Sequence, residues 1–542
     1  MCNKILHRFR IFLQILSFLS GGNMAKIVVD PLNRVEGHLK VEAVVENGIV
    51  KEARSAGTMW RGFENILRNR NPLDAQRITQ RMCGVCPIAH TMASTLNLDN
   101  AFGIADRIPD NGRIIRNLIL GSNFLQSHIL HFYALAALDF VDVAAAADYD
   151  GSNRHLRQVQ SFIKRGSLYP FFPRYEGDYR LRKNENVQAV QHYAESLDIR
   201  RLSHEMLAIW GGNMPQSVAI VPGGVTENPT VSKIADFRFR LKKISHFIEN
   251  AYIPDVLMVA SRYPDYFEIG GGLKEYLSYG CFELDTEPDL VKRERLFKGG
   301  RITLSDLNKM PLDPQKITED VTHAWYKQNG ALHPSVGVTE PDRQKEKAYS
   351  WLKAPRYEGK PYEVGPLARQ LMAYVDGYEP TVSLVDSVLG QFNASPAVLG
   401  STLGRHAARA IEAKIVADRM AEWVLELKPG EPVHTHFEIP EEASGYGITE
   451  APRGGVGHWI SIKNYMTDNY QAVVPTTWNG SPRDENNVPG PFEQALEGTR
   501  VRDEKNPFEL VRIVRSFDPC LACAVHVVTP KGNEIARFVI EG

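Results

Sequence analysis

Two pairs of cysteines, each followed by a histidine, lie near opposite ends of the 542-residue chain. The first pair is in "RMCGVCPIAH", residues 81–90, and the second is in "DPCLACAVH", residues 518–526. Cysteine binds metal as a soft thiolate that suits zinc, iron, nickel and copper(I). Two cysteines three positions apart on a tight turn can face one ion. Together the two pairs supply enough thiolates for one complete four-ligand site, namely Cys83, Cys86, Cys520 and Cys523.

The residues after the first pair predict its local structure. Pro87 directly follows Cys86 and suits the first turn of a helix. The pair is therefore expected at a helix N-terminus, where the helix dipole lowers the pKa of a thiol and stabilises the thiolate. His90 comes four residues after Cys86, on the same helix face, and is placed to hydrogen-bond a cysteine sulfur.

The spacing of the pairs bears on the alternatives. A lone Cys-x-x-Cys unit also fits a redox dithiol, and two units are typical of a structural zinc site with four cysteine ligands. Zinc ribbons join pairs only about 15–20 residues apart. Here 437 residues separate Cys83 from Cys520. Structural zinc stays open as an interpretation, although the spacing does not favour it.

Both ends of the chain are predicted to contribute strands to the fold that positions these residues. Residues 26–57 alternate between apolar and polar side chains, with Asn47 and Gly48 as a hairpin turn. Residues 455–475 read as a second hairpin. Residues 274–365 are rich in proline, glycine and charge and are expected to be irregular.

Between the two hairpins the pattern is mainly helical. Residues 113–146 predict a long buried core helix that breaks near Gly121. Further helices are predicted at residues 185–212, 230–262, 367–377 and 401–430. The expected fold is mainly α with small β regions, an α+β arrangement whose large helical core receives sheets from the N- and C-terminal segments.

Composition excludes some classes of function. The chain has a formal net charge of -1, 43% hydrophobic and 23% charged residues, which is ordinary for a globular protein and gives no support to nucleic-acid binding. Six cysteines are present, of which Cys2 and Cys281 have no partner motif. No later window has 18 consecutive apolar residues, so no transmembrane helix is expected.

Residues 1–23 read as an extension. Basic residues precede a mostly apolar run at 11–19, which is too short to span a bilayer and lacks a clear cleavage site. This segment resembles a weak signal peptide. The simpler interpretation is an upstream start codon, with Met24 as the first residue of the protein.

With its flanking residues, the cysteine pattern resembles a known family. "RxCGxCPxxH" and "DPCxxCxxH" are the paired signatures of nickel–iron hydrogenase large subunits, and some relatives are of the nickel–iron–selenium type. The chain is also similar to this family at residues 30–42, 61–64, 125–143, 451–459 and 469–479. The resemblance extends from Ile27 to the C-terminus. It implies the hydrogenase large-subunit fold, with residues 24–526 as one intertwined domain.

The resemblance implies reversible splitting of H2 into protons and electrons at a nickel–iron centre. Cys83 and Cys520 match the terminal nickel thiolates, and Cys86 and Cys523 match the thiolates that bridge nickel and iron. In the family, the iron carries carbon monoxide and cyanide. Four thiolates that leave one coordination position open meet the usual requirement of a catalytic metal.

The resemblance also assigns residues around this centre. A terminal thiolate such as Cys520 can act as the base, and Glu36 of "RVEGH" matches the carboxylate that relays the proton. Arg453 of "APRG" matches an arginine over the open metal position. Pro475 and Thr476 match the segment around the diatomic ligands of iron. Taken alone, Glu36 would be a solvated turn residue and Arg453 an ordinary surface arginine.

A second metal near the C-terminus is implied by the same resemblance. Glu64, the backbone carbonyl of Ala472 and His526 match the ligands of a magnesium ion, and the histidine also permits iron. Glu64 alone would be read as a salt-bridge partner. His128 and His131 lie on the long predicted helix and are interpreted as satisfied core histidines rather than ligands.

The segment after His526 resembles a propeptide. In the family, a dedicated endopeptidase removes such a tail after nickel-insertion proteins have delivered the metal, so we expect cleavage after His526 and loss of residues 527–542. Hydrogen-sensing relatives commonly lack this tail, which favours catalysis over sensing. The related subunit of respiratory complex I has lost the cysteine pairs.

One departure from the family pattern stands out, and one position varies within the family. Many members have histidine where this chain has Gln216 in "GGNMPQS", near the partner's first iron–sulfur cluster. Some relatives carry selenocysteine at the position of Cys520.

The partner and the compartment are also implied. Because only two cysteines remain outside the site, the electrons require a small subunit that carries iron–sulfur clusters. Uptake-type relatives reach the periplasm on the small subunit's signal, and some associate with the membrane through it. The expected location is therefore periplasmic, with a cytoplasmic alternative.

Overall fold

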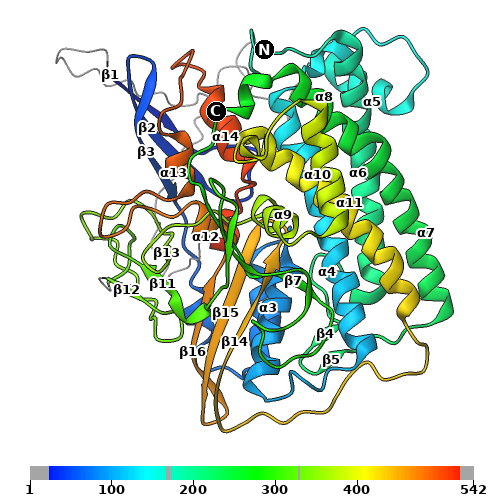
Figure 1. Ribbon diagram of the computed structural model, residues 1–542, viewed down its shortest axis with the longest axis vertical. Coiled ribbons are helices and arrows are strands. Elements are labelled where there is room, and N and C mark those ends of the chain that lie inside the picture. Colours follow the sequence, from blue (N-terminus) through cyan, green and yellow to red (C-terminus); the bar gives the residue numbers. More distant parts are fainter. Residues whose placement is uncertain (1–23, 167–170, 172–173, 328–329, 525–542) are drawn as a thin grey trace.

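The computed structural model describes residues 24–166, 171, 174–327 and 330–524 (Figure 1). Residues 1–23, with Cys2, and residues 525–542, with His526, lie outside the described residues, as does the side chain of Cys523. Among the helices of the described residues, none combines the length and apolarity that crossing a bilayer requires.

The N-terminal segment forms the predicted antiparallel sheet. Its strands are β1 (Met24–Val29), β2 (Leu39–Glu46) and β3 (Ile49–Gly57), in the order β1-β2-β3. Asn47 and Gly48 connect β2 to β3, both with positive φ, as a tight hairpin turn requires. Alternate residues of β2 are buried, so one face of the sheet packs on the core and the predicted hairpin is confirmed.

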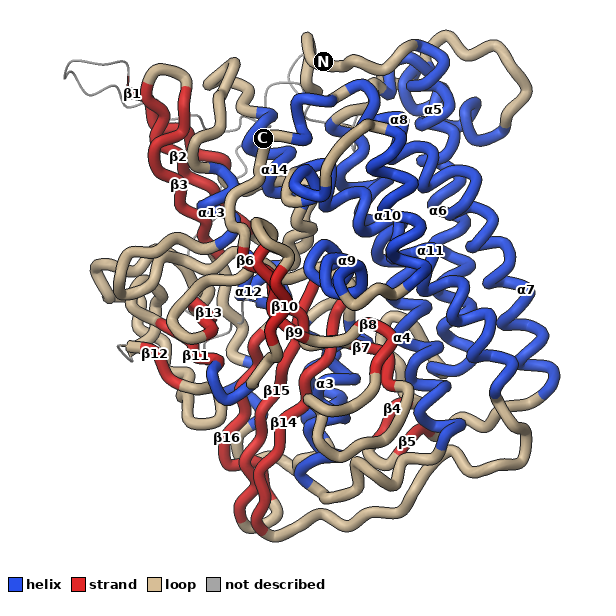
Figure 2. The backbone as a smooth tube through the Cα atoms, in the orientation of Figure 1, coloured by secondary structure: helices blue, strands red, loops and turns tan. Residues whose placement is uncertain are grey.

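Long helices form one side of the molecule, and the two main sheets lie on the other side (Figures 1 and 2). The main helices of this layer are α4 (Asp110–Leu130), α6 (Lys183–Gly211), α7 (Val231–Phe247) and α11 (Thr402–Glu426). Shorter helices at its edges are α5 (Arg154–Lys164), α8 (Ile253–Arg262), α9 (Pro366–Val375) and α10 (Glu379–Gln391). The predicted α+β class with a large helical core is confirmed.

The predicted helix break at Gly121 is wrong. Helix α4 continues to Leu130 and then passes into a π-helical turn, His131–Ala136. A Cβ atom at Gly121 would lie 2.5 Å from the sulfur of Met420 on α11. The glycine therefore lets α4 and α11 approach each other, and it does not break the helix.

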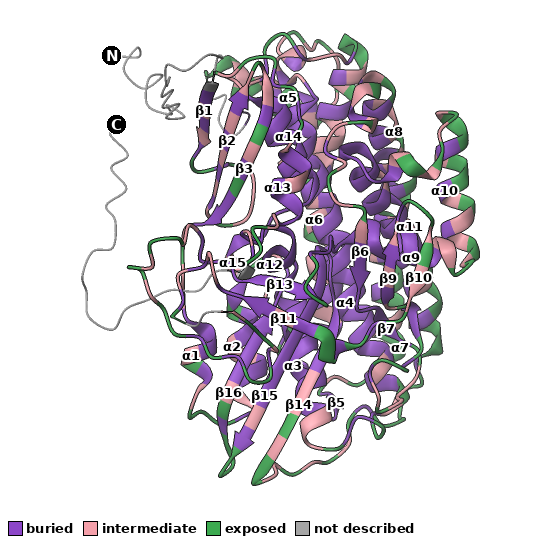
Figure 3. Ribbon diagram, turned by 60° about the vertical axis from the view of Figure 1, so that its left-hand side comes forward, coloured by how far each residue is buried: buried purple, intermediate pink, exposed green. Residues whose placement is uncertain are grey.

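The second main sheet is antiparallel and has the order β14-β15-β16. Its strands are β14 (Glu442–Ala451), β15 (Gly454–Lys463) and β16 (Met466–Val473). Strands β15 and β16 form the predicted hairpin, and β14 is an additional strand that was not predicted. Helix α3 (Pro87–Ala101) packs against this sheet, and thirteen of its residues are buried. Figure 3 shows that the buried residues are concentrated where this sheet meets the helices.

The expectation of irregular structure at residues 274–365 is wrong in part. The segment contains two small antiparallel sheets, β10-β9-β6 and β12-β11-β13, and the two-stranded pair β7-β8. The strands are short, which explains why no alternating pattern was visible in the sequence. Their bounds are β6 (Glu275–Ser278), β7 (Cys281–Glu283), β8 (Arg295–Phe297), β9 (Gly300–Thr303), β10 (Asn308–Met310), β11 (Ile317–Asp320), β12 (Ala331–Leu332) and β13 (Ala354–Tyr357).

The remaining elements are short. Strands β4 (Ile220–Val221) and β5 (Gly224–Val225) pair with each other. The short helices are α1 (Phe63–Leu67), α2 (Asp74–Thr79), α12 (Pro475–Asn479), α13 (Pro491–Leu496), α14 (Phe508–Ser516) and α15 (Leu521–Ala524).

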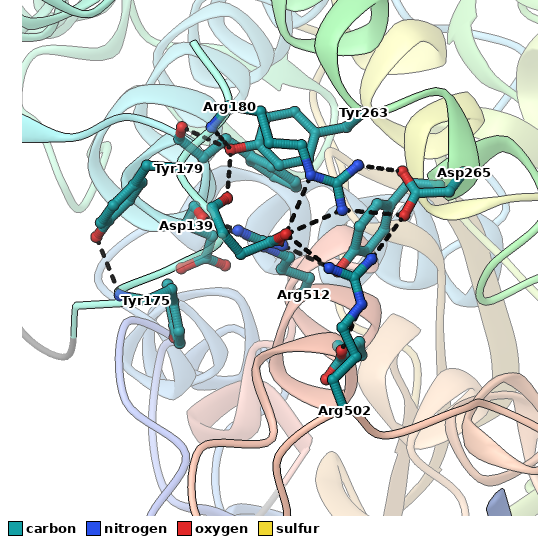
Figure 4. Close-up of polar contacts among 12 residues, drawn as sticks. Asp139, Tyr175, Tyr179, Arg180, Tyr263, Asp265, Arg502 and Arg512 are labelled. Carbon is teal, nitrogen blue, oxygen red and sulfur yellow. Dashed lines mark hydrogen bonds and ion pairs between the residues drawn. The ribbon is translucent and has the colours of Figure 1, made fainter. Parts of the chain in front are cut away.

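Buried arginines of α14 bond the segments that connect the helices of this layer, and Figure 4 shows one of them, Arg512. Arg512 forms an ion pair with Asp178, donates to the Asp139 carbonyl and donates to the hydroxyl of Tyr266 at 2.9 Å. Arg515 donates to Asp139 Oδ1 at 2.5 Å. These bonds fix the C-terminal segment just before its cysteine pair.

Candidate metal centre

Three of the four predicted cysteine ligands meet in the core. The Sγ atom of Cys520 lies 3.3 Å from that of Cys83 and 3.9 Å from that of Cys86. All three side chains are buried, and their sulfur atoms lie within 4.8 Å of one another. The structure thus unites the two motifs at one point. The side chain of the fourth predicted ligand, Cys523, lies outside the described residues.

The first pair sits at a helix N-terminus, as the sequence predicts. Helix α3 begins at Pro87, and Cys86 is its N-cap residue. The sulfur of Cys83 accepts hydrogen bonds from the N–H groups of Val85, at 3.2 Å, and Cys86, at 3.4 Å. Backbone donors directed at a sulfur stabilise the thiolate form, which is the form that binds metal.

The second pair is held beside the N-terminal loop. Glu36 and Cys520 form an isolated parallel β-bridge. Gly37 has a φ of 88°, and a Cβ atom there would lie 2.7 Å from the backbone nitrogen of Ala522. Only glycine allows the two segments to approach this closely, because it combines the positive φ with the absence of a side chain.

The carboxylate of Glu36 faces the thiols. Its Oε2 atom lies 3.2 Å from Cys520 Sγ and accepts a hydrogen bond from the Ala522 N–H at 2.9 Å. Burial and the nearby Cys83 raise the pKa of Glu36 to about 7. The structure brings this predicted relay residue into contact with the predicted base.

Arg453 is fully buried and is therefore not a surface arginine. Its Nε donates to the Asp518 carbonyl at 3.1 Å, and its Nη1 donates to Ser127 Oγ at 3.3 Å. Nη2 lies 3.1 Å from Asp518 Oδ1 but makes no hydrogen bond within the described residues. Although burial opposes its charge, Asp518 and the three cysteines raise the pKa of Arg453.

Thr476 also contacts the site. It lies in α12, which begins at Pro475, and both residues are buried. The hydroxyl oxygen of Thr476 accepts a hydrogen bond from the Cys520 N–H at 2.9 Å. The helix start thus holds the backbone of one cysteine in place.

Glu64 lies in a second polar cluster. Its Oε1 accepts from the N–H of Ala472 at 3.0 Å, and its Oε2 accepts from the Thr339 hydroxyl. Lys353 Nζ lies 3.5 Å from Glu64 Oε2 and 3.0 Å from Glu319 Oε2. The structure therefore places the two predicted second-metal residues that it describes side by side.

His90 is buried on α3, and the described partner of its ring is another histidine. Its Nδ1 lies 3.3 Å from Nε2 of His458, whose Nδ1 is 2.7 Å from the Tyr470 hydroxyl. Burial lowers the pKa of His90 to about 4, so the ring is neutral. The proposed bond from His90 to a cysteine sulfur stays a prediction, since the side chain of Cys523 is not described.

The structure also describes the residues to which the sequence analysis gave no role as metal ligands. His128 Nε2 lies 2.8 Å from Glu412 Oε1, and His131 Nε2 lies 2.7 Å from the Arg515 carbonyl. Both are buried core histidines, as predicted, but only one ring nitrogen of each is bonded, because neither Nδ1 has a hydrogen-bond partner among the described residues. Cys281 is buried on β7 and forms no disulfide. Gln216 is half-buried in the loop after α6.

Sequence reasoning missed several residues of these two clusters. They are Ser127 and Asp518 beside Arg453, and Thr339, Lys353, Glu319 and Gln471 beside Glu64. Asp518, Ser127 and Gln471 lie within segments that resemble the family, whereas Thr339, Lys353 and Glu319 belong to no motif. Their role depends on tertiary contacts between distant segments.

The described side chains fit a metal bound by thiolates. Three buried sulfur atoms converge, and a buried guanidinium offers charge to balance them. The Nη2 atom of Arg453 lies 3.1 Å from Asp518 Oδ1 but makes no hydrogen bond among the described residues, so its N–H groups are available to a further group. Soft thiolate ligands favour nickel and iron over magnesium or calcium.

The converging thiols indicate a protein with a metal–thiolate site, and comparison with known proteins identifies its class. The family model described as "Nickel-dependent hydrogenase" matches residues 61–526. The chain belongs to this family, as a nickel–iron hydrogenase large subunit close to the nickel–iron–selenium type, and it is an enzyme that acts on H2.

Individual relatives are similar over nearly their whole length. The chain is 41% identical to the periplasmic [NiFeSe] hydrogenase large subunit of Desulfomicrobium baculatum, over 94% of this chain and 96% of the relative. It is 36% identical to the quinone-reactive Ni/Fe-hydrogenase large chain of Wolinella succinogenes, over 95% and 98%. The solved Ni-Fe-Se hydrogenase of D. vulgaris Hildenborough in the reduced state matches with a TM-score of 0.83 and 42% identity, over 93% and 100%.

Proposed function

We propose that this chain cleaves H2 heterolytically and reversibly at a nickel–iron centre bound by the thiolates of Cys83, Cys86, Cys520 and Cys523. The observation that carries the proposal is the convergence of three buried sulfur atoms within 4.8 Å, from segments at opposite ends of the chain. The family membership selects nickel and iron over the structural zinc alternative.

When bound, the centre would supply a Lewis acid that polarises H2 and an acceptor for its two electrons, with carbon monoxide and cyanide on its iron. The side chains of this protein move the proton. Cys520 accepts it as the base, and Glu36, whose Oε2 lies 3.2 Å from the Cys520 sulfur, carries it toward the surface. Arg453 places a fixed positive charge beside the thiolates.

Two contacts orient the base. The hydroxyl of Thr476 accepts from the Cys520 N–H, and the β-bridge with Glu36 fixes the same backbone from the other side. We assign Pro475 and Thr476, both buried, to the wall around the diatomic ligands of iron. His90 supports the thiolates from the first turns of α3.

We also propose a magnesium or iron ion bound by Glu64, the Ala472 carbonyl and His526. The buried Glu64 and Glu319 place two carboxylates in one cluster, which suits a hard cation. Lys353 lies between the two carboxylates and holds them in place. The histidine completes this set only after the tail has been removed.

The mature chain is proposed to be one intertwined domain, residues 24–526. A maturation endopeptidase removes residues 527–542 after nickel-insertion proteins have loaded the site. A small subunit with iron–sulfur clusters receives the electrons. Like the relative named periplasmic, the complex is assigned to the periplasm, with membrane association through the small subunit.

Substitution of a single thiol tests the proposal. The purified heterodimer with Cys520→Ser is expected to lose H2 oxidation with a redox dye, and its nickel content is expected to fall. Cys281→Ala removes a buried cysteine outside the cluster and should retain both. Elemental analysis should find nickel and iron in the wild type and will show whether selenium is present. Zinc alone, or full turnover by Cys520→Ser, would contradict the proposal.

A further inference from the structure

The turn between β14 and β15, which carries Arg453, is held by a guanidinium from another segment. Arg369 lies on α9 and is fully buried. Its Nη1 donates to the Ala451 carbonyl at 3.1 Å, and its Nη2 donates to the Pro452 carbonyl at 2.9 Å. These two residues directly precede Arg453. Arg369 therefore contacts the backbone that determines where the Arg453 side chain begins.

The other donors of Arg369 bind two carboxylates. Nε and Nη2 donate to the two oxygens of Glu412 at 2.7 and 2.6 Å, and Nη1 donates to Glu450 Oε2 at 2.6 Å. All five N–H groups of this guanidinium therefore have acceptors. A lysine has three donors on a single nitrogen and cannot reproduce this planar arrangement.

Both carboxylates are anchored in turn. Glu412 on α11 bonds His128 on α4 at 2.8 Å, and Glu450 Oε1 accepts from the Tyr279 N–H at 2.6 Å. Burial opposes ionisation of Glu412, but the charge and hydrogen bonds of Arg369 outweigh it and lower the pKa of Glu412 to about 2. The carboxylate is therefore charged, and the network links α4, α9, α11 and β14 rigidly.

The same network reaches the other end of Arg453. Its Nη1 donates to Ser127 Oγ, and Ser127 directly precedes His128 on α4. The backbone before Arg453 and the hydroxyl that accepts from its side chain are thus fixed through one set of buried bonds. Displacing Arg369 would loosen the turn while leaving the cysteines untouched.

We propose that Arg369 is a positioning residue for Arg453, which it holds beside the metal-binding thiols by fixing the carbonyls of Ala451 and Pro452. The proposal rests on the function proposed above for Arg453. It differs from a purely structural role, because the effect of Arg369 on turnover should pass through Arg453 alone.

A double-mutant cycle on the metal-loaded heterodimer tests this route. Arg369→Lys is expected to lower kcat about tenfold, equivalent to about 1.4 kcal/mol, without changing KM for H2. Arg453→Lys should lower kcat at least as much. The double variant should equal Arg453→Lys within about twofold, because the two residues act as a unit.

Arg116 on α4 offers a matched control. It is also buried, bonds the carboxylate of Asp99 and donates to the carbonyls of Gly224 and Val221, none of which belongs to the site. Arg116→Lys should leave kcat within about twofold of the wild type. An equal loss of kcat in both arginine variants would overturn the proposal.

A second readout does not depend on turnover. Amide hydrogen exchange of the peptide spanning residues 448–458 should be faster in Arg369→Lys than in the wild type or Arg116→Lys. If Arg453→Lys keeps the wild-type kcat, the function proposed for Arg453 is wrong. Hydrogen exchange in Arg369→Lys still tests whether Arg369 holds the turn that carries Arg453. Unchanged exchange in this peptide would overturn the positioning itself.

A second variant serves if Arg369→Lys prevents assembly with the small subunit. If Arg369→Lys does not form the heterodimer, Glu412→Gln enters the same cycle, since it keeps the shape of the acceptor and weakens its hold on Arg369. Glu412→Gln is expected to lower kcat less than Arg369→Lys would, and to cause no further loss when it is combined with Arg453→Lys. Losses that multiply with those of Arg453→Lys, in either cycle, would mean that the network only stabilises the fold.

Discussion

Glu36 and Cys520, from opposite ends of the chain, are backbone neighbours. The Glu36 N–H donates to the Pro519 carbonyl at 3.2 Å, and the Leu521 N–H donates to the Glu36 carbonyl at 2.7 Å. These bonds determine the backbone positions from which the carboxylate and the thiol approach to 3.2 Å. The proposed base and its relay are therefore aligned by main-chain contacts, which few substitutions would disturb.

Replacement of Glu36 by glutamine should separate proton transfer from metal binding. Glutamine keeps the size and can still accept from the Ala522 N–H, but it cannot take up and release a proton at neutral pH. We expect Glu36→Gln to lower H2 oxidation about 100-fold or more, with nickel content unchanged. Glu36→Asp, which keeps a carboxylate, should retain more activity. Wild-type turnover by Glu36→Gln would remove this residue from the proton path.

Gly37→Ala should weaken the junction between the two chain ends. The added Cβ would lie 2.7 Å from the Ala522 nitrogen. The positive φ of this position adds a backbone cost of about 1 kcal/mol or more for alanine. We therefore expect a several-fold lower nickel content in the purified protein.

Gly103→Ala is the control for this substitution. Gly103 also has positive φ, but no atom lies within 4 Å of the added Cβ. If both variants bind nickel equally, the close approach of the two segments is not needed for the site.

Stability should fall with rising pH through a buried carboxyl of α13. Burial raises the pKa of Glu493 to about 7, although the Ser55 N–H and the Tyr349 hydroxyl donate to it. Because the folded form keeps its proton at a pH where the unfolded form has lost it, the free energy of unfolding declines from about pH 4.5 to pH 7. The loss is on the order of 3 kcal/mol.

Glu493→Gln should remove most of this decline. Its Tm by calorimetry should match the wild type at pH 5 and exceed it at pH 8, because the neutral amide has no proton to lose. An identical fall in Tm for both proteins between these pH values would contradict the assignment.

The end of the mature chain provides a further prediction. We expect the intact mass of the active large subunit to correspond to a chain that ends at His526. His526→Ala should block cleavage and leave a heavier, inactive chain, since the proposed ligand of the second metal is lost. An active chain that retains Gly542 would refute the propeptide.

The sequence predicts the part of the site whose residues belong to short motifs with fixed spacing. The start of α3 at Pro87 and the N-terminal hairpin follow from local chemistry. The meeting of Cys83 with Cys520 follows from ligand number, because four thiolates complete one site.

Other features depend on contacts that no local pattern reveals. Gly121 looks like a helix breaker, yet the approach of Met420 makes it a packing position. Arg369 and Lys353 stand alone in the sequence. The acceptors of Arg369 come from two distant segments, and those of Lys353 come from three. Their importance arises only from burial, which makes each of their hydrogen bonds necessary.

The infrared spectrum of the purified heterodimer tests the central claim most directly. A nickel–iron centre bound by the four cysteines predicts carbon monoxide and cyanide bands that shift when argon is replaced by H2. The Cys281→Ala protein should show the same bands and the same shift, and Cys520→Ser should not. A fully metal-loaded wild-type protein without such bands, or with bands that do not respond to H2, would contradict the account.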